Sequence, residues 1–486
     1  MTKGSVANPP QSLGNRFNFA RYQRVLQVTF LEARWLGFGL IIWSLVLSGC
    51  EKESVRVEKA QRRQLAHELQ NHSYAAAAPI ARQLLQRKPH DERIWKQLLH
   101  AQLGLHDLEG AKQSLERWRT AVPKHSIRLE EFQGDIARDE KNHPAALAAW
   151  EKVIQTQPNN IRVRKKIAML HQSLQHWAEA EAAWNEAMKL KETSAERLNR
   201  AICRRRLHRW NEAFEDYRRA VELGPDDPEV HRWSKVFDGL QTNKQQLGEF
   251  DAKLAVLPDE IGLLSDRALL FLRSEDPEMA LEDAQHAARL APWALRPKLF
   301  QGIALIRLGR TKQADALGVR RPISLQSLTP EFLESASRLD LAIAVERSNS
   351  EHFIARSWQL NEIGQPKLAA QDAEAAVRLD PRSAGALTEL AYALTKLGRA
   401  EEAYDKVRQA TTFDPNSAPA WQYRGELEMA RGDYLTAVDS LTHAAGIHQS
   451  VAVLQKRAEC YQRLGLNGRA EEDHRTVQRL MATSVQ

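Results

Sequence analysis

The chain of 486 residues is strongly polar, with 27% charged residues and a mean hydropathy of −0.51. This composition indicates a chain that is soluble over most of its length, and it argues against disorder. Without residues 1–49, which hold five basic residues and one acid, the net charge falls from +7 to +3. The charge balance therefore does not indicate nucleic-acid binding.

The first predicted element is an apolar run of thirteen residues, Trp35–Leu47, preceded by several arginines. A helix that spans a bilayer needs about 20 residues, so a secretory signal segment fits this run better. The run ends at Leu47-Ser48-Gly49-Cys50, which resembles the lipobox of bacterial lipoproteins. The resemblance implies a signal peptide over residues 1–49, diacylglycerol on Cys50 and a lipidated linker over residues 50–57.

By the same resemblance, Glu51 in place of an aspartate favours an outer-membrane position facing the periplasm. Several alternatives stay open. The run could be an uncleaved membrane anchor, or Cys50 could be a buried cysteine after a chance apolar segment. Because more than thirty residues precede the run, a later start codon is open as well.

Beyond residue 57, small residues recur every 33–35 residues, with one longer step of 55 after Ala314. The recurring positions are Ala77, Ala111, Ala146, Ala180, Ala213, Gln246, Ala280, Ala314, Ala369, Ala403, Ala437 and Ala470. The clearest copy contains two amphipathic segments, Leu387–Lys396 and Ala400–Ala410, and ends at Pro415. Each copy is a predicted helical hairpin. One hairpin cannot bury both apolar stripes, so about twelve copies must stack.

The period, the small residues and a proline twelve residues after most of them resemble the tetratricopeptide repeat. Signature positions support the resemblance, and they are Trp95, Trp421, Gly134, Gly302, Gly425, Tyr461 and the pair Ala146 and Trp150. We assign the tryptophans to core packing. The resemblance implies an all-α fold, an α-solenoid of about twelve hairpins that forms a right-handed superhelix.

Two stretches depart from the pattern. In repeat six, Gln246 replaces the small residue and Thr242-Asn243-Lys244 shortens the turn, which predicts a distorted hairpin. Residues 318–349 contain an extra helical segment between Pro330 and Arg347, which predicts an irregular break or half-repeat. The break would separate a block of about eight repeats, residues 58–317, from one of about four, residues 350–486.

Catalytic motifs are not apparent. His67-Glu68 with His72 approaches a zinc-protease motif, but its histidines are five residues apart where the chemistry needs four. The scattered carboxylates indicate solvated helix faces, and Cys203 and Cys460 indicate core residues without a disulfide. We therefore expect no enzyme activity, catalytic residue, metal or cofactor.

The resemblance places positions 2, 5, 6, 9, 12 and 13 of each first helix on a concave groove. In repeats four to six these positions predict an electropositive groove, opposed only by Asp238. Its residues are Arg162, Lys165, Lys166, Asn199, Arg205, Arg206, Arg232 and Lys235. Such a groove suits an acidic peptide, a C-terminal carboxylate or an anionic polysaccharide, and the alternative is a solvated basic face.

Three of these residues also match the carboxylate clamp of chaperone-binding repeat proteins, namely Lys165, Asn199 and Arg232, whereas Met169 and Pro228 break that pattern. A second groove in the last block combines aromatic and polar residues, which suits an extended peptide or a glycan. Its residues are Trp358, Tyr392, Gln422 and Tyr423. Packing between repeats is the alternative role for this set.

These features predict a lipid-anchored scaffold that binds other proteins at the bacterial cell envelope. By resemblance, the host complex would serve envelope assembly or exopolysaccharide export. The alternative is a repeat adaptor held by an uncleaved N-terminal anchor and binding an acidic peptide or a C-terminal carboxylate. No nucleic-acid partner is expected.

Overall fold

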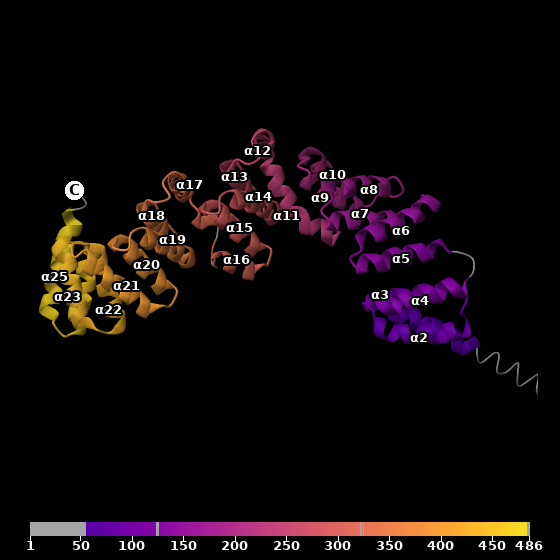
Figure 1. The fold of residues 1–486 in the computed structure, drawn as a ribbon, viewed down its shortest axis with the longest axis horizontal. Coiled ribbons are helices and arrows are strands. Elements are labelled where there is room, and N and C mark those ends of the chain that lie inside the picture. Colours follow the sequence, from indigo (N-terminus) through magenta and orange to yellow (C-terminus); the bar gives the residue numbers. More distant parts are fainter. Residues whose placement is uncertain (1–54, 123–125, 321–322, 324, 484–486) are drawn as a thin grey trace, which may run out of the picture. The chain divides into compact units, whose positions relative to one another are not determined.

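The computed structural model describes residues 55–122, 126–320, 323 and 325–483 (Figure 1). The signal segment and Cys50 lie outside these residues. The described residues contain α-helices, one short 3-10 helix and no strand, which confirms the all-α prediction. Among the helices described, none combines the length and apolar character needed to cross a membrane.

The chain divides into two compact regions, Met1–His176 and Trp177–Gln486. In the first region, residues 55–70 are helical, and the helices that follow are α2 Tyr74–Arg87, α3 Glu92–Gly104, α4 Leu108–Ala121, α5 Ile127–Asp139, α6 His143–Thr156 and α7 Ile161–Ser173. The boundary at residue 176 is one that the sequence did not mark. The predicted repeat blocks remain predictions.

The second region continues the series of hairpins. Its elements are α8 Trp177–Met188, α9 Ser194–Arg206, α10 Trp210–Leu223, α11 Pro228–Thr242, α12 Lys244–Val256, α13 Ile261–Arg273, α14 Pro277–Leu290, α15 Leu295–Arg307, α16 Thr311–Leu317, η1 Leu325–Ser327, α17 Pro330–Val345, α18 Ser350–Glu362, α19 Pro366–Leu379, α20 Ala384–Lys396, α21 Ala400–Phe413, α22 Ala418–Arg431, α23 Tyr434–Ile447, α24 Val451–Arg463 and α25 Asn467–Thr483.

The hairpin of α20 and α21 shows how the sequence produces each repeat. Ser383 caps α20 by accepting a hydrogen bond from the Ala386 amide. Gly398, with φ of +80°, takes the left-handed conformation that ends α20 and reverses the chain. The second helix ends before Pro415, which cannot continue it. Both predicted helices are confirmed, with α20 and α21 each extending three residues beyond the predicted segments.

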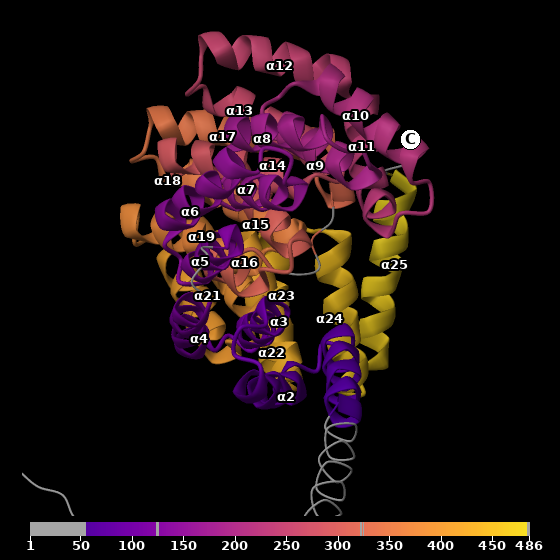
Figure 2. The ribbon, with the colours of Figure 1, turned by 90° about the vertical axis from the view of Figure 1, so that its right-hand side faces the viewer.

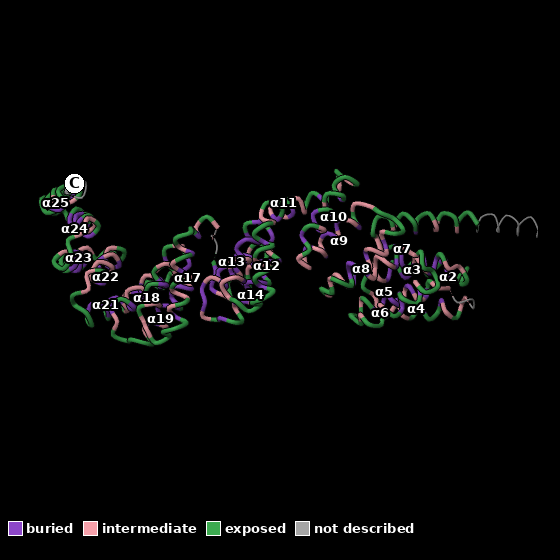
Figure 3. The backbone as a smooth tube through the Cα atoms, turned by 90° about the horizontal axis from the view of Figure 1, so that it is seen from above, coloured by how far each residue is buried: buried purple, intermediate pink, exposed green. Residues whose placement is uncertain are grey.

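The recurring small residues lie where the helices cross. All of these alanines are buried, whereas Gln246 of repeat six is exposed. Gly134 on the first helix α5 likewise allows close packing of helices, because a Cβ there would lie 2.4 Å from the Trp150 ring. Figure 3 shows the resulting pattern, with buried residues where helices meet and exposed residues at the turns and outer faces. The alignment of repeats is therefore confirmed by packing.

Four hairpins of the second region also contain an internal ion pair that the sequence analysis missed. In each, an arginine of the first helix donates through Nε and Nη2 to an aspartate sixteen residues later, at 2.5–2.9 Å. The pairs are Arg200–Asp216, Arg267–Asp283, Arg356–Asp372 and Arg457–Asp473. Assigning these four carboxylates to solvated faces was wrong, since all four aspartates are buried.

Repeat six is distorted, as predicted. Its turn contains no residue with positive φ, unlike the turns of the other repeats, so α12 does not fold back onto α11. In two perpendicular views α12 lies outward of α13 and α14 (Figures 1 and 2). The vacated space lets repeat five pack directly on repeat seven, where the rings of Trp210 and Phe271 are 6.0 Å apart.

An irregular stretch with an extra helix follows repeat eight, as predicted. Helix α16 has seven residues and ends at Gly318, whose φ is +90°. The short helix η1 follows, and the extra helix α17 packs against α15 and α18. The apolar positions Leu333, Ala336 and Ile343 form the buried face of α17.

Candidate functional site

The first region contains a groove lined by the first helices of three successive repeats, α3, α5 and α7. It encloses a hollow of about 680 Å³. Its lining residues are Arg93, Lys96, Gln97, His100, Leu103, Gly104, His106, Arg128, Glu131, Phe132, Asp135, Arg138, Asp139, Arg162 and Lys166. All but His106 occupy positions 2, 5, 6, 9, 12 or 13 of their helices. The rule for the concave face therefore holds in this region.

One side of the groove is electrostatically satisfied. Lys166 Nζ lies 2.8 Å from Glu131 Oε1 and 2.6 Å from Asp135 Oδ2, and Arg162 also pairs with Glu131. Burial raises the pKa of Glu131, but Lys166 and Arg162 outweigh burial and hold that pKa below its usual value. For Asp135 burial dominates and its pKa is raised despite Lys166. The predicted groove residues on α7 are thus largely engaged within the protein.

The other side of the groove carries unpaired cations. Arg93 and Lys96 on α3 and Arg128 on α5 make no ion pair with a carboxylate of the described residues. Burial and the charges of Arg128, Arg162 and Arg93 lower the pKa of Lys96, and together they outweigh the opposing charge of Glu92. Burial, followed by His72, lowers the pKa of His100 in the same way. The cations repel one another, so an anion bound here would relieve an existing electrostatic cost.

Two of the four predicted cationic residues of the second region, Arg205 and Arg206, are engaged inside the protein. Arg205 is 1% exposed and pairs with Asp276 and, at 2.9 Å, with Glu278. Arg206 pairs with Glu282, and its guanidinium lies 4.8 Å from the Trp177 ring. Placing Arg205 and Arg206 in a ligand groove was wrong, because displacement of α12 lets α9 meet α14.

The remaining predicted residues are dispersed. Asn199 Nδ2 donates to the Ala195 carbonyl at 2.8 Å, and exposed Arg232 pairs with Glu229 on its own helix at 2.6 Å. Lys235 is exposed. Lys165 lies half-buried on α7 and belongs to the first region. The expectation that only Asp238 opposes the set was also wrong, since six acids pair with its members, Glu131 and Asp135 on α5, Glu229 on α11, and Asp276, Glu278 and Glu282 at the start of α14.

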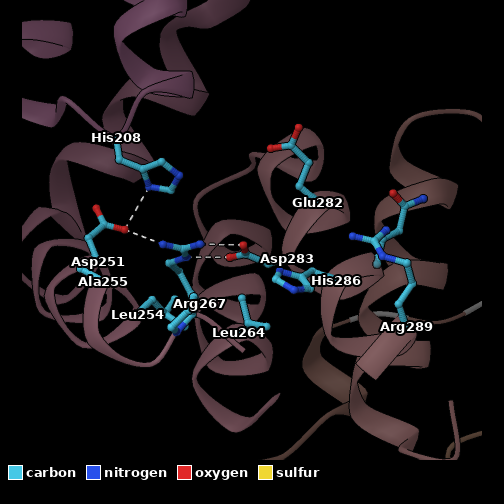
Figure 4. A pocket seen from close by; sticks show the side chains of 12 residues that line it. His208, Asp251, Leu254, Ala255, Leu264, Arg267, Glu282, Asp283, His286 and Arg289 are labelled. Carbon is cyan, nitrogen blue, oxygen red and sulfur yellow. Dashed lines mark hydrogen bonds and ion pairs between the residues drawn. The ribbon is translucent and has the colours of Figure 1, made fainter. Parts of the chain in front are cut away.

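A second hollow of about 680 Å³ lies between α12, α13 and α14 (Figure 4). On its wall Asp251 accepts hydrogen bonds from Trp210 Nε1 and Arg267 Nη1, each at 2.6 Å, and lies 2.9 Å from His208 Nδ1. Burial raises the pKa of Asp251, but these donors outweigh it and lower that pKa overall. Because Arg267 also pairs with Asp283, the polar wall is satisfied and serves the packing of repeat seven.

The second predicted groove is partly assembled. Tyr392 on α20 and Tyr423 on α22 have ring centroids 5.4 Å apart, and Gln422 donates to Glu426 at 2.9 Å. Burial raises the pKa of Tyr423 to about 12. Trp358 on α18 is 55% exposed. Tyr392, Gln422 and Tyr423 thus lie together on the neighbouring first helices α20 and α22. The ring of Trp358 on α18 is exposed to solvent.

Neither thiol of the second region is placed for chemistry. Cys203 on α9 and Cys460 on α24 are free and buried. Burial raises their pKa values to about 12 and about 11. Within the described residues, no group of three or more His, Cys, Asp or Glu side chains could hold a metal ion.

Comparison with known proteins supports the repeat assignment. Models of the tetratricopeptide repeat match residues 68–136, 165–228 and 362–418. A curated relative, the protein CTR9 homolog of Arabidopsis thaliana, is 23% identical over 314 residues, which is 62% of this chain. The chain spans only 27% of that relative's length.

Similar solved structures include MamA, with 19% identity, a TM-score of 0.29, and coverage of 33% of this chain and 95% of MamA. The APC/C hetero-tetramer Cut9–Hcn1 and Naa15/Naa10 bound to HypK-THB are each 12% identical and cover 86% of this chain. They are covered to 93% and 75%, with TM-scores of 0.27 and 0.29. We draw no argument from scores of this size. The three matched segments and the stacked hairpins together show that this chain carries tetratricopeptide repeats in an α-solenoid.

Proposed function

We propose that this protein is a non-enzymatic scaffold whose groove on α3, α5 and α7 binds an acidic segment of a partner protein. The observation that carries the proposal is the cluster of Arg93, Lys96 and Arg128, unpaired on a concave face. Guanidinium and ammonium groups form their strongest hydrogen bonds with carboxylates. Repeat arrays present such extended concave surfaces for binding.

The groove itself indicates how carboxylates would be held. On its satisfied side, Arg162 and Lys166 already bind Glu131 and Asp135, which lie one helical turn apart. The unpaired side offers the same types of cation from α3 and α5. A partner segment with two neighbouring acidic side chains would pair with these cations, as Glu131 and Asp135 of α5 pair with Arg162 and Lys166.

The proposal extends to the place of action. The lipobox-like sequence before Cys50 supports a lipid anchor, and Glu51 supports an outer-membrane position facing the periplasm. The scaffold would then serve an envelope-assembly or exopolysaccharide-export complex. An uncleaved anchor is the alternative, and an anionic polysaccharide is the alternative ligand for the same cations.

Binding of a fluorescent peptide tests the groove. A dodecapeptide of alternating Glu and Ser should bind the wild-type protein, and affinity should fall at least tenfold in the double variant Lys96→Glu, Arg128→Glu. The control is Arg87→Glu, Arg117→Glu, which makes the same charge change with exposed residues on the second helices α2 and α4. Wild-type affinity should also weaken with salt, because the contacts are ionic.

Equal losses in both double variants would reduce the effect to net charge and contradict the proposal. Binding of a soluble polyuronate without binding of the peptide would favour the polysaccharide. The anchor is tested separately with Cys50→Ala. Accumulation of an unprocessed form supports lipidation, whereas unchanged processing and unchanged membrane association support the uncleaved anchor.

A further inference from the structure

We infer a second interaction surface, of opposite polarity, on the first helices α18, α20 and α22. It receives an arginine side chain from a basic segment of a partner protein. These helices lie side by side in the second region (Figure 1). The inference goes beyond the acidic-segment groove and rests on different residues, so either can fail without the other.

The surface is built around an acceptor that lacks a donor. Asn361 on α18 is only 7% exposed, and its Nδ2 donates to Glu389 Oε2 on α20 at 3.1 Å. The Asn361 Oδ1 atom is buried and has no hydrogen-bond partner among the described residues. Buried polar atoms are nearly always paired, so an unmatched acceptor beside a carboxylate indicates a missing donor.

The carboxylates beside Asn361 are also without a cation. Neither Glu389 nor its neighbour Glu362 forms an ion pair with a described lysine, arginine or histidine. Burial and then the charge of Glu362 raise the pKa of Glu389 above its usual value. Here two carboxylates lie close together without a cation, whereas in the groove of the first region cations lie close together without a carboxylate partner. The carboxylates therefore suit a positively charged ligand.

Aromatic rings complete the surface. The rings of Tyr392 and Tyr423 are 5.4 Å apart and tilted by 48°, next to Glu389. Rings of this kind attract a guanidinium placed over their faces. The chain shows the same arrangement elsewhere, since the guanidinium carbon of Arg431 lies 3.8 Å from the centroid of Tyr404 and its Nη2 pairs with Glu401.

Internal cations leave this part of the surface open. Lys456 Nζ pairs with Glu426 of α22 at 2.8 Å, so this carboxylate already has a cation. Lys396 Nζ lies 5.2 Å from the Tyr392 ring and is not within ion-pair distance of Glu389. The unsatisfied acceptors are therefore those of Glu389 and Asn361.

Geometry selects arginine over lysine. The carboxylate of Glu389 on α20 and the side-chain carbonyl of Asn361 on α18 are two separate acceptors from different helices. A guanidinium presents five N–H groups in one plane and can stack on tyrosine at the same time, whereas an ammonium is a point charge. Arg356, on the same helix as Asn361, shows how one guanidinium serves two acceptors, since its Nε and Nη2 donate to Asp372 and its Nη1 donates to Asp340.

The test compares three peptides that differ at one residue, a flexible Gly-Ser heptapeptide with arginine, lysine or citrulline at its centre. Binding to the full chain is followed by NMR titration or fluorescence anisotropy. The arginine peptide should bind at least fivefold more tightly than the lysine peptide, and the citrulline peptide should not bind. Equal binding of the arginine and citrulline peptides overturns the inference.

Variants separate recognition from folding. Glu389→Gln should weaken the arginine peptide at least tenfold without lowering the unfolding temperature, because burial already disfavours the charged carboxyl. Glu374→Gln, an exposed acid on the second helix α19, should leave affinity unchanged. The double variant Tyr392→Leu, Tyr423→Leu should weaken binding while Glu389 is intact.

Wild-type affinity in Glu389→Gln, or an equal loss in Glu374→Gln, overturns the assignment. The variant Lys96→Glu, Arg128→Glu of the first region should bind the arginine peptide as the wild type does. The binding of the acidic peptide to this variant therefore tests the proposed function alone, and the binding of the arginine peptide tests this inference alone.

Discussion

The ion pair between Arg205 and Asp276 should hold repeats five and seven together. Both side chains are almost wholly buried, at 1% and 2% exposure. Truncating one member of such a pair leaves the other charged and buried, which costs about 3–5 kcal/mol. We expect Arg205→Met to lose about 3 kcal/mol of unfolding free energy, because Asp276 keeps one hydrogen bond as the cap of α14.

The second contact of Arg205 contributes little to this figure. Glu278 is 52% exposed, and exposed ion pairs are worth about 0–1 kcal/mol. The double variant Arg205→Met, Asp276→Asn should therefore recover at least about 1 kcal/mol, since asparagine is neutral and still caps a helix. Arg205 also lies 4.8 Å from the Trp233 ring, a contact that methionine partly replaces by packing.

Urea unfolding followed by circular dichroism gives the free energies, and hydrogen exchange of α9 and α14 locates the loss. Exchange should quicken in both helices, although they belong to repeats that a regular array keeps apart. A loss below about 1 kcal/mol in Arg205→Met, or a double variant less stable than the single one, would refute the reasoning.

Three further predictions concern packing and titration. Gly134→Ala should destabilise the first region by about 1–3 kcal/mol in urea unfolding, because its Cβ would meet the Trp150 ring at 2.4 Å. With thiol pKa values of about 12 and about 11, Cys203 and Cys460 should resist iodoacetamide at pH 8 and react only as fast as their hairpins open, as measured by mass spectrometry. The folded state lowers the pKa of Asp251, so this carboxylate stabilises the fold above its unfolded pKa of about 3.9, and the contribution disappears as pH falls through the lower folded value. Asp251→Asn should flatten the acid limb of the stability curve, and an unchanged limb would contradict this.

The sequence predicted the hairpins well because their signals are local. A small residue at each crossing and a proline after most second helices depend only on the packing of neighbouring helices. Gln246 marked the distorted repeat for the same reason. The arginine–aspartate pairs also had a local signal, a spacing of sixteen residues at one register, as in Arg200 and Asp216.

The candidate site was predictable only in part. The concave positions line the groove of the first region, and applying them to repeats two and three would have identified Arg93, Lys96 and Arg128. The burial of Arg205 in an ion pair could not be predicted from these positions. Its partner Asp276 is 71 residues distant and comes within reach only because α12 leaves the stack. Pairing of that kind depends on three-dimensional packing that no periodicity records.

The central claim, that the groove of the first region binds an acidic segment, is tested most directly by zero-length crosslinking. Carbodiimide activation of the Glu-Ser dodecapeptide joins its carboxylates to amines in contact with them. The lowered pKa of Lys96 favours its reaction. We predict that Lys96 is the main crosslinked residue and that salt suppresses the product. Crosslinks spread over exposed lysines such as Lys59 and Lys189, with Lys96 no more reactive than they are, would contradict the account.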